Sequence, residues 1–313
     1  MTILWRAAPC LVPLGLVFAV QDRFALSVLA FAAAQALFVA GWDLVGGASG
    51  QPTLGHALPL GAGAYFATFV AGWNLAPLPT AVAGGALAGG LAGALQGRLG
   101  ARLSRLSLAV VTLATAEAAR EVSSVFRFVW PGGLVVGGDS GIPMVVYPAD
   151  EASAARLAAA VLVVGVAALL WIGGSSLGLA MRTVRADDRL AAASGIDVVR
   201  VRVLAFVIAG AVAGLAGGLA AAMTGRASPA MLSLEPSLFA FAVASIAGPG
   251  TIVGPAAAAY TMTAALQWLD VPGTIRLTLD AALLIAGAFG PSAAAHLRRV
   301  RHVSTPVPAS SAR

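Results

Sequence analysis

SGQPTLGHALPLGAGAY, residues 49–65, is an uncharged stretch that combines four glycines, two prolines, a glutamine and one of the three histidines of the chain. Apolar runs flank it on both sides. In lipid an unpaired backbone group is costly, so irregular backbone at membrane depth survives only where protein buries it or where it lines a watery cavity. The stretch therefore predicts a solute path, a close helix contact made by its small residues, or both together.

The composition of the chain is that of a membrane protein. Of its 313 residues, 59% are hydrophobic and only 10% are charged, and the mean hydropathy is +0.90. Soluble domains carry about 25% charged residues. We therefore expect an all-α, polytopic membrane protein.

Several other classes of protein are disfavoured by the same residues. The 19 basic residues are all arginine, and they form a few clusters rather than a stripe interleaved with aromatics, which argues against nucleic-acid binding. Cys10 is the one cysteine, so no internal disulfide or structural zinc site is encoded. The sequence has no nucleophile–histidine–acid grouping and no HExxH motif, which indicates that the protein is not an enzyme and needs no metal. Without lysine it also has no phosphate-binding G-x-x-x-x-G-K-[ST] loop, so any ATP must be hydrolysed by another subunit.

Apolar segments recur along nearly the whole chain, and a spanning helix needs about 20 such residues. The first could be a signal peptide, but Val20-Gln21-Asp22-Arg23 offers no small-residue cleavage site, so we expect it to be retained as a helix. The segments are 7–20, 24–45, 54–71, 79–97, 106–126, 155–174, 201–224, 237–248, 254–269 and 276–296.

Arginine clusters predict which loops are cytoplasmic, because positive residues favour that side. Any two such loops must be separated by an even number of crossings, and two segments lie between the first and second clusters. Between the second and third clusters the count is even only if the run 237–269 is broken at AGPGTIVGP. We expect eight to ten spanning helices, some short or broken, with both termini cytoplasmic. The clusters are Arg98, Arg102 and Arg105; Arg182, Arg185, Arg189, Arg200 and Arg202; and Arg298, Arg299 and Arg301.

Several sequence blocks together resemble a known family. GGASGQPTLGHALPLGAGAY is similar to the signature of the inner-membrane permease subunits of branched-chain amino acid ABC transporters, a family that also includes urea permeases. LSLAVVTLATAEAAREV (106–122) resembles its glutamate-bearing helix, and VGGDSGIP (136–143) resembles its Gly-Gly-x-x-Gly external loop. The block 177–219 resembles its cytoplasmic loop and following helix, and the block 228–260 resembles its late glycine-rich break. The family usually has serine where Thr53 stands and a Gly-Gly-x-Gly run where Ala247-Gly248-Pro249-Gly250 stands, so the departures bear on the solute more than on the fold.

The resemblance implies a function, partners and a location. It implies the permease subunit of an importer for branched-chain or other aliphatic amino acids, with urea or short amides as the alternative solutes. Its expected partners are a second homologous permease subunit, two cytoplasmic ATPase subunits that bind the ATP, an extracytoplasmic solute-binding protein and membrane lipid. It implies a bacterial cytoplasmic membrane, a single transmembrane domain over 1–297 and a basic cytoplasmic tail over 298–313. An ATP-independent channel or secondary carrier is the alternative mechanism, although the few ionisable residues within the apolar segments fit ion coupling poorly.

Two breaks in the apolar pattern, 47–65 and 248–260, resemble each other weakly, because each has spaced glycines and ends in small residues followed by tyrosine. If they are equivalent elements of an inverted repeat, both approach a central pathway, where free backbone groups can bind a zwitterion. A lone histidine beside glycines is more often a hydrogen bonder in helix packing than a ligand, which is the simpler role for His56. The residues predicted to line the path are Gly50, Gln51, Thr53, His56, Glu117, Gly248, Gly250 and Thr251.

Glu117 has a second interpretation. Arg120 follows three residues later on the same helix and is adjacent to Glu121, so these side chains are also placed for a structural ion pair near the outer interface. The sequence leaves both roles open.

The longest polar stretch is GLAMRTVRADDRLAAASGID, residues 178–197. On one continuous helix Leu179, Ala186, Leu190 and Ala193 share a narrow stripe, flanked by arginines, with Gly195 as the stop. Such a helix can lie on anionic lipid, but two aspartates facing away from the arginines, and the resemblance to the family's ATPase-docking loop, favour a protein groove. The residues predicted to couple the subunit to its ATPase are Arg182, Arg185, Asp187, Asp188, Arg189 and Gly195.

Overall fold

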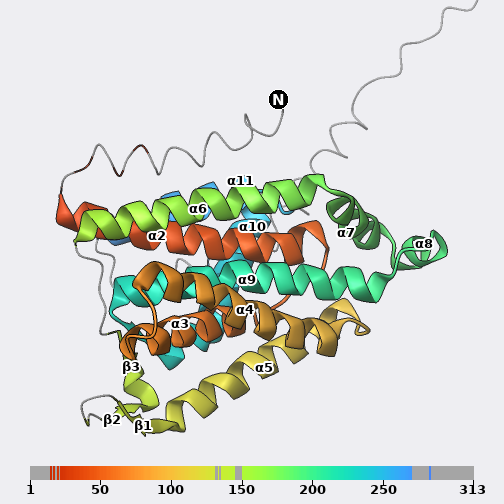
Figure 1. Ribbon diagram of the computed structural model, residues 1–313. Helices are drawn as coiled ribbons and strands as arrows, with labels where there is room; N and C mark the ends of the chain where they lie inside the picture. Colours follow the sequence, from red (N-terminus) through yellow and green to blue (C-terminus); the bar gives the residue numbers. More distant parts are fainter. Residues whose placement is uncertain are drawn as a thin grey trace, which may run out of the picture.

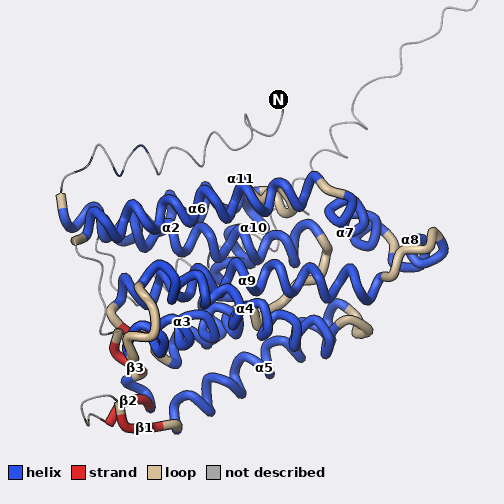
Figure 2. The backbone as a smooth tube through the Cα atoms, viewed as in Figure 1, coloured by secondary structure: helices blue, strands red, loops and turns tan. Residues whose placement is uncertain are grey.

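The computed structural model describes residues 22–130, 133, 135–144 and 150–269, together with positions 15, 17, 20 and 282. Helices dominate these ranges, as Figures 1 and 2 show, which confirms the all-α prediction. The α-helices are α2 (Arg23–Trp42), α3 (Ala57–Gly72), α4 (Leu78–Gly100), α5 (Arg105–Val125), α6 (Glu151–Gly174), α7 (Ser176–Ala186), α8 (Asp188–Ala193), α9 (Val198–Thr224), α10 (Leu234–Ala247) and α11 (Val253–Trp268). A π-helix, η1 (Asp43–Ala48), continues α2, and two short 3-10 helices are η2 (Gly138–Ser140) and η3 (Pro229–Leu232).

The helices match the apolar segments closely where the two can be compared. Four stretches are long and apolar enough to cross a membrane in the described part of the chain: Arg23–Ala48, Leu78–Gly100, Glu151–Gly174 and Val198–Thr224. The run 237–269 is broken between α10 and α11, as an even number of crossings between the second and third arginine clusters requires. Both helices are shorter than a full span, so the count of eight to ten crossings stays a prediction. The segments 7–20 and 276–296, Cys10, the third arginine cluster and the tail from residue 298 fall outside the described stretches.

The two ends of the bundle differ in structure. In Figure 1 the long helices run side by side, with short strands at one end and α7 and α8 at the other. β1 (Arg127–Val129) pairs antiparallel with β2 (Val135–Gly137), and β3 (Ile142–Pro143) pairs antiparallel with β4 (Arg226–Ala227). We call these pairs the strand end.

The first two arginine clusters meet at the end opposite the strands. The Arg105 guanidinium donates to the Arg185 carbonyl oxygen at 3.0 Å, and that of Arg202 donates to the Ala101 carbonyl oxygen at 2.8 Å. Two helices, α5 and α6, separate the clusters in sequence, so an even number of passes returns the chain to the same end. We call this end the arginine end.

Side-chain caps explain why several helices begin where they do. The carboxylates of Asp22, Asp150 and Asp197 accept hydrogen bonds from the first-turn backbone of α2, α6 and α9, which satisfies amides that have no partner within the helix. Each of these aspartates lies at the polar start of an apolar run, so each marks the residue at which a helix begins.

Helices α4 and α9 pack backbone against backbone. Glycines recur at every fourth position of α4: Gly85, Gly89 and Gly93 face Gly210 and Gly214 of α9, and Gly97 faces Val203 and Phe206. A Cβ atom on Gly89 would lie 2.6 Å from the Gly214 Cα atom, closer than side chains approach. Without a hydrophobic drive between helices in lipid, small residues of this kind supply the close van der Waals contact that holds helices together.

Candidate functional site

The π-helix η1 turns the chain out of α2 and into the first glycine–proline break. Its wider turn leaves Asp43, the first residue of η1, with no exposed surface. The turn requires glycine at position 47, because a Cβ atom there would overlap the Asp43 carboxylate and the Gly250 amide. π-Helical turns within α-helices are frequent at functional sites.

Asp43 joins this first break to the second one. Its Oδ1 atom accepts a hydrogen bond from the Gly250 backbone amide at 2.7 Å, and its Oδ2 atom accepts one from the Ile252 amide at 2.8 Å. Asp43 and its two partners lie 207 and 209 residues apart in sequence. A carboxylate at the N-terminus of α11 also meets the positive end of the helix dipole. One buried charge therefore holds both breaks in a single arrangement.

The second break is shaped to present these two amides. Gly250 has φ +90°, a left-handed conformation that glycine adopts easily. Ile252 has φ +65°, which is rare for a β-branched residue and costs of order 1–3 kcal/mol. The bond from the Ile252 amide to Asp43 helps to hold that conformation, so the carboxylate supports local strain as well as the contact between the breaks.

Arg185 reaches the same place from α7. Its guanidinium donates a hydrogen bond to the Gly47 carbonyl oxygen, in the turn that begins with Asp43. The side chain also passes directly over Gly50, where a Cβ atom would lie 2.7 Å from the Arg185 Cγ atom. We call Asp43, Gly47, Arg185, Gly250 and Ile252 the Asp43 cluster. It brings Arg185, a residue predicted for ATPase coupling, into contact with Gly50 and Gly250, which were predicted for the path.

The remaining polar residues of the first break are buried beside this cluster. Gln51 donates to the Ser49 hydroxyl at 3.0 Å, and the Thr53 carbonyl accepts from the Trp42 indole at 2.9 Å. His56 packs on the Phe38 ring, with ring centroids 5.1 Å apart. Neither nitrogen of His56 has a hydrogen-bond partner among the described residues. The expected role of His56 as a hydrogen bonder in helix packing is therefore not what the structure shows, since its contact is with an aromatic ring.

Thr251 lies at the exposed edge of the second break. Its hydroxyl donates to the Gly248 carbonyl oxygen at 2.8 Å, which closes the turn between α10 and α11. The two residues adjoin the Asp43 cluster through Gly250 and Ile252. Their assignment to the path stays a prediction.

Glu117 lies apart from the Asp43 cluster and has the geometry of an ion pair. The Arg120 Nε atom donates to the Glu117 carboxylate at 2.6 Å, and the same guanidinium also contacts Glu121. The Glu117 and Arg120 side chains are each 35% exposed. This geometry supports the structural role that the sequence left open.

Replacing Glu117 with glutamine is expected to leave solute uptake within about fivefold of wild type, because half-exposed ion pairs contribute only about 0.2–1 kcal/mol. Uptake and the apparent melting temperature of the purified subunit are the measurements. Arg120→Gln, which removes both contacts, is the matched variant and should lower the melting temperature more than Glu117→Gln does. A stable Glu117→Gln subunit that no longer transports would instead place Glu117 in the path.

The segment 178–197 is not one continuous helix, so the predicted stripe is wrong. Asp187 ends α7 and begins α8, where its carboxylate accepts from the amides of Arg189 and Leu190 at 2.8 and 3.1 Å. These two bonds, that to Leu190 foremost, hold the pKa of Asp187 below its ordinary value of 3.8, so the cap is fully charged at neutral pH and is lost only as the pH falls through the lowered pKa. An N-cap aspartate interrupts a helix more readily than it continues one.

The break divides the predicted coupling residues by role. Asp188 pairs with Arg202 of α9, and the Arg182 guanidinium donates to the Gly173 carbonyl oxygen at 2.7 Å. Gly195 follows α8 with φ +82°, which confirms its predicted role as the helix stop. Arg189 is exposed. Exposed apolar side chains also remain on this segment: Leu179 is 61% exposed and Leu190 is 64% exposed.

Asp43 is the functional candidate that the sequence reasoning missed. A lone acidic residue inside the apolar run 24–45 is the signal that could have found it, because ionisable groups in spanning segments are costly and mark functional sites. The described residues hold no group of three or more histidine, cysteine, aspartate or glutamate side chains that could bind a metal.

Comparison with known proteins gives one match. The family model described as "Branched-chain amino acid transport system / permease component" matches residues 24–288, which is most of the chain. No curated protein and no solved structure matches the chain. The matched range contains the Asp43 cluster and both breaks.

Proposed function

The chain belongs to the family of permease components of branched-chain amino acid transport systems, and from that membership we propose that it is the transmembrane permease subunit of an ABC importer. Transport permeases are not an enzyme class. The subunit passes its solute across a bacterial cytoplasmic membrane while separate ATPase subunits hydrolyse the ATP. The arginine end faces the cytoplasm and the strand end faces outward, in keeping with the rule that positive residues favour the cytoplasmic side.

The Asp43 cluster is the observation that carries this proposal. Arg185 belongs to a helix at the arginine end, yet its guanidinium contacts the backbone of the first break, which Asp43 ties to the second. A displacement of α7 is therefore transmitted to both breaks through hydrogen bonds and close packing. An importer driven by cytoplasmic ATPases needs such a connection, whereas an ATP-independent channel or carrier does not.

Helices α7 and α8 are the proposed docking site for the ATPase. Outside the apolar spans they present two largely exposed leucines, Leu179 and Leu190, together with the exposed Arg189. Exposed apolar side chains rimmed by charge are typical of a protein interface. The break at Asp187 means that two short helices, rather than one, fit the partner's groove.

The solute that we propose is a branched-chain or other aliphatic amino acid, with urea or a short amide as the alternative. The two breaks offer backbone groups and few charged side chains, which suits a small solute that is recognised mainly by shape. The full importer comprises a second homologous permease subunit, two ATPase subunits and an extracytoplasmic solute-binding protein. The transmembrane domain occupies 1–297, and 298–313 is a cytoplasmic tail.

Two variants separate docking from transmission in the assembled importer. Arg189→Glu combined with Leu190→Glu should reduce the amount of ATPase that co-purifies with the membrane subunit about tenfold or more, because a buried interface leucine is replaced by charge. Arg185→Gln should keep the ATPase bound but uncouple ATP hydrolysis from uptake, because the bond that is lost goes to the first break of the same subunit. Arg182→Gln is the matched control, since it removes an arginine of the same helix whose side-chain hydrogen bond, among the described residues, goes to Gly173 rather than to a break.

The outcomes distinguish the alternatives. Normal ATPase association and normal uptake in both variants would show that α7 and α8 only hold the subunit to the membrane surface. Solute flux that persists without the ATPase subunits would favour a channel or secondary carrier.

A further inference from the structure

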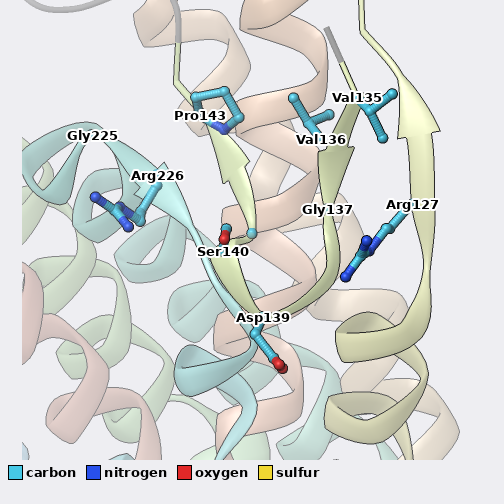
Figure 3. A pocket seen from close by; sticks show the side chains of 10 residues that line it. Arg127, Val135, Val136, Gly137, Asp139, Ser140, Pro143, Gly225 and Arg226 are labelled. Carbon is cyan, nitrogen blue, oxygen red and sulfur yellow. The ribbon is translucent and has the colours of Figure 1, made fainter.

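A cavity of about 780 Å³ opens between the two strand pairs at the strand end. Its lining includes side chains from β1, β2, η2, β3 and β4, several of which are shown in Figure 3. β3 and β4 also contact α3, the helix that follows the first break. The cavity therefore lies at the end opposite the ATPase docking helices and is connected by α3 to the proposed path.

The cavity carries both signs of charge. Arg127 and Arg226 lie on either side of the turn that bears Asp139 and Ser140, as Figure 3 shows. The Arg127 guanidinium leans over that turn, so that a Cβ atom on Gly138 would be 3.1 Å from its Nε atom. Within the described residues neither arginine forms an ion pair or a side-chain hydrogen bond, and Asp139 forms no ion pair.

Apolar side chains complete the lining. Val135, Val136 and Pro143 border the cavity beside the charged groups. Small-molecule sites combine an apolar wall with a few convergent polar groups, and their volumes run from about 300 to 1,000 Å³. Arginine binds a carboxylate through paired donors, and an aspartate can accept from an ammonium group.

We propose that this cavity is an extracytoplasmic subsite for an aliphatic amino acid in its zwitterionic form, a proposal that rests on the transport function proposed above. An arginine binds the carboxylate, Asp139 accepts from the ammonium group, and the valines and the proline contact the aliphatic side chain. The solute occupies this subsite before it reaches the first break along α3.

An acidic face of a partner protein is the competing occupant, and the lining argues against it. The lining holds the carboxylate of Asp139 as well as the two arginines, so a surface of carboxylates would meet a like charge there. A zwitterion uses both signs at once. The hollow form of the site also suits a small molecule better than a broad protein face.

Binding of three probes to the purified full-length subunit, measured by saturation-transfer NMR, tests the proposal. The probes are L-leucine, 4-methylpentanoate, which lacks the ammonium group, and 3-methylbutylamine, which lacks the carboxylate. Leucine should bind most tightly. Asp139→Asn should weaken leucine and the amine about two- to fivefold, the range for exposed ion pairs, but should tighten 4-methylpentanoate.

Arg127→Gln and Arg226→Gln should show the opposite pattern, weakening leucine and 4-methylpentanoate while leaving the amine unchanged or tighter. Arg156→Gln is the control, because Arg156 is an exposed arginine outside the cavity. A variant that merely unfolds the turn would weaken all three probes together, so the opposite signs identify a direct charge contact.

Three results would overturn the subsite. Leucine that does not bind, or binds equally well to all the variants, excludes it. Variants that shift the acid and the amine in the same direction exclude the charge assignment. If the arginine variants leave leucine binding intact but weaken the association of the solute-binding protein with the subunit, the cavity is a docking surface instead. ATP-driven uptake in the assembled importer is measured separately, so the transport function can stand even where the subsite fails.

Discussion

Asp43→Asn is expected to lower ATP-driven uptake about ten- to a hundredfold while the subunit still inserts in the membrane. Asparagine has nearly the same shape, but its amide nitrogen is a donor and must face either the Gly250 or the Ile252 amide, both of which also donate. One of the two bonds is therefore lost, together with a carboxylate whose two oxygens both accept. Hydrogen bonds to charged groups contribute about 1.5–3 kcal/mol, which is about ten- to a hundredfold in an equilibrium.

Uptake into vesicles that hold the assembled importer, together with subunit abundance on the same membranes, is the measurement. Asp150→Asn is the matched control, because Asp150 is an exposed N-cap at which asparagine serves as well as aspartate. Gly47→Ala should cause the same defect by displacing the Asp43 carboxylate, which the new methyl group would overlap. Wild-type uptake by Asp43→Asn would show that the two breaks do not depend on this carboxylate.

Gly89→Ala is expected to destabilise the subunit by about 1–3 kcal/mol, the usual cost of overpacking a tight contact. The new methyl group would lie 2.6 Å from the Gly214 Cα atom, and backbone cannot move aside as a side chain can. The methyl group must therefore push α4 and α9 apart.

Gly90→Ala on the same helix is the control for Gly89→Ala. Its methyl group would meet the Ala211 Cβ atom at 3.6 Å, an ordinary contact. Alanine also favours a helix over glycine by about 1 kcal/mol, so this variant should be neutral or slightly stabilised. The measurement is the melting temperature of each purified variant in detergent. Equal melting temperatures for the two variants would contradict the close packing of α4 against α9.

Hydropathy was sufficient to predict the four long apolar helices of the described residues, because each of their runs is continuous. The start of α9, for example, follows from the capping residue Asp197 before an apolar run. The break near Gly248 was predicted by the parity of the arginine clusters together with its own glycines and prolines. Both inferences depend on properties that a linear sequence displays directly.

The Asp43 cluster could not be predicted in the same way. The two hydrogen bonds of Asp43 join residues more than 200 positions apart and that of Arg185 joins residues 138 apart, so no local pattern pairs them. Arg185 was predicted to pair with a partner protein from an amphipathic pattern, and that pattern gave no sign of the bond from its guanidinium to Gly47. The break at Asp187 was missed for a different reason. The helical pattern of 178–197 was extended past Asp187, which instead caps the start of a new helix.

The sharing of one carboxylate by both breaks also bears on leakage. If the pathway opens by separating the breaks, opening requires that both amide bonds to Asp43 be given up together. Two bonds to a charged acceptor at about 1.5–3 kcal/mol each make spontaneous opening rarer by about a hundred- to ten-thousandfold. Under the proposed transport function, the subunit then stays closed to ions and solutes without a separate plug until both bonds are released.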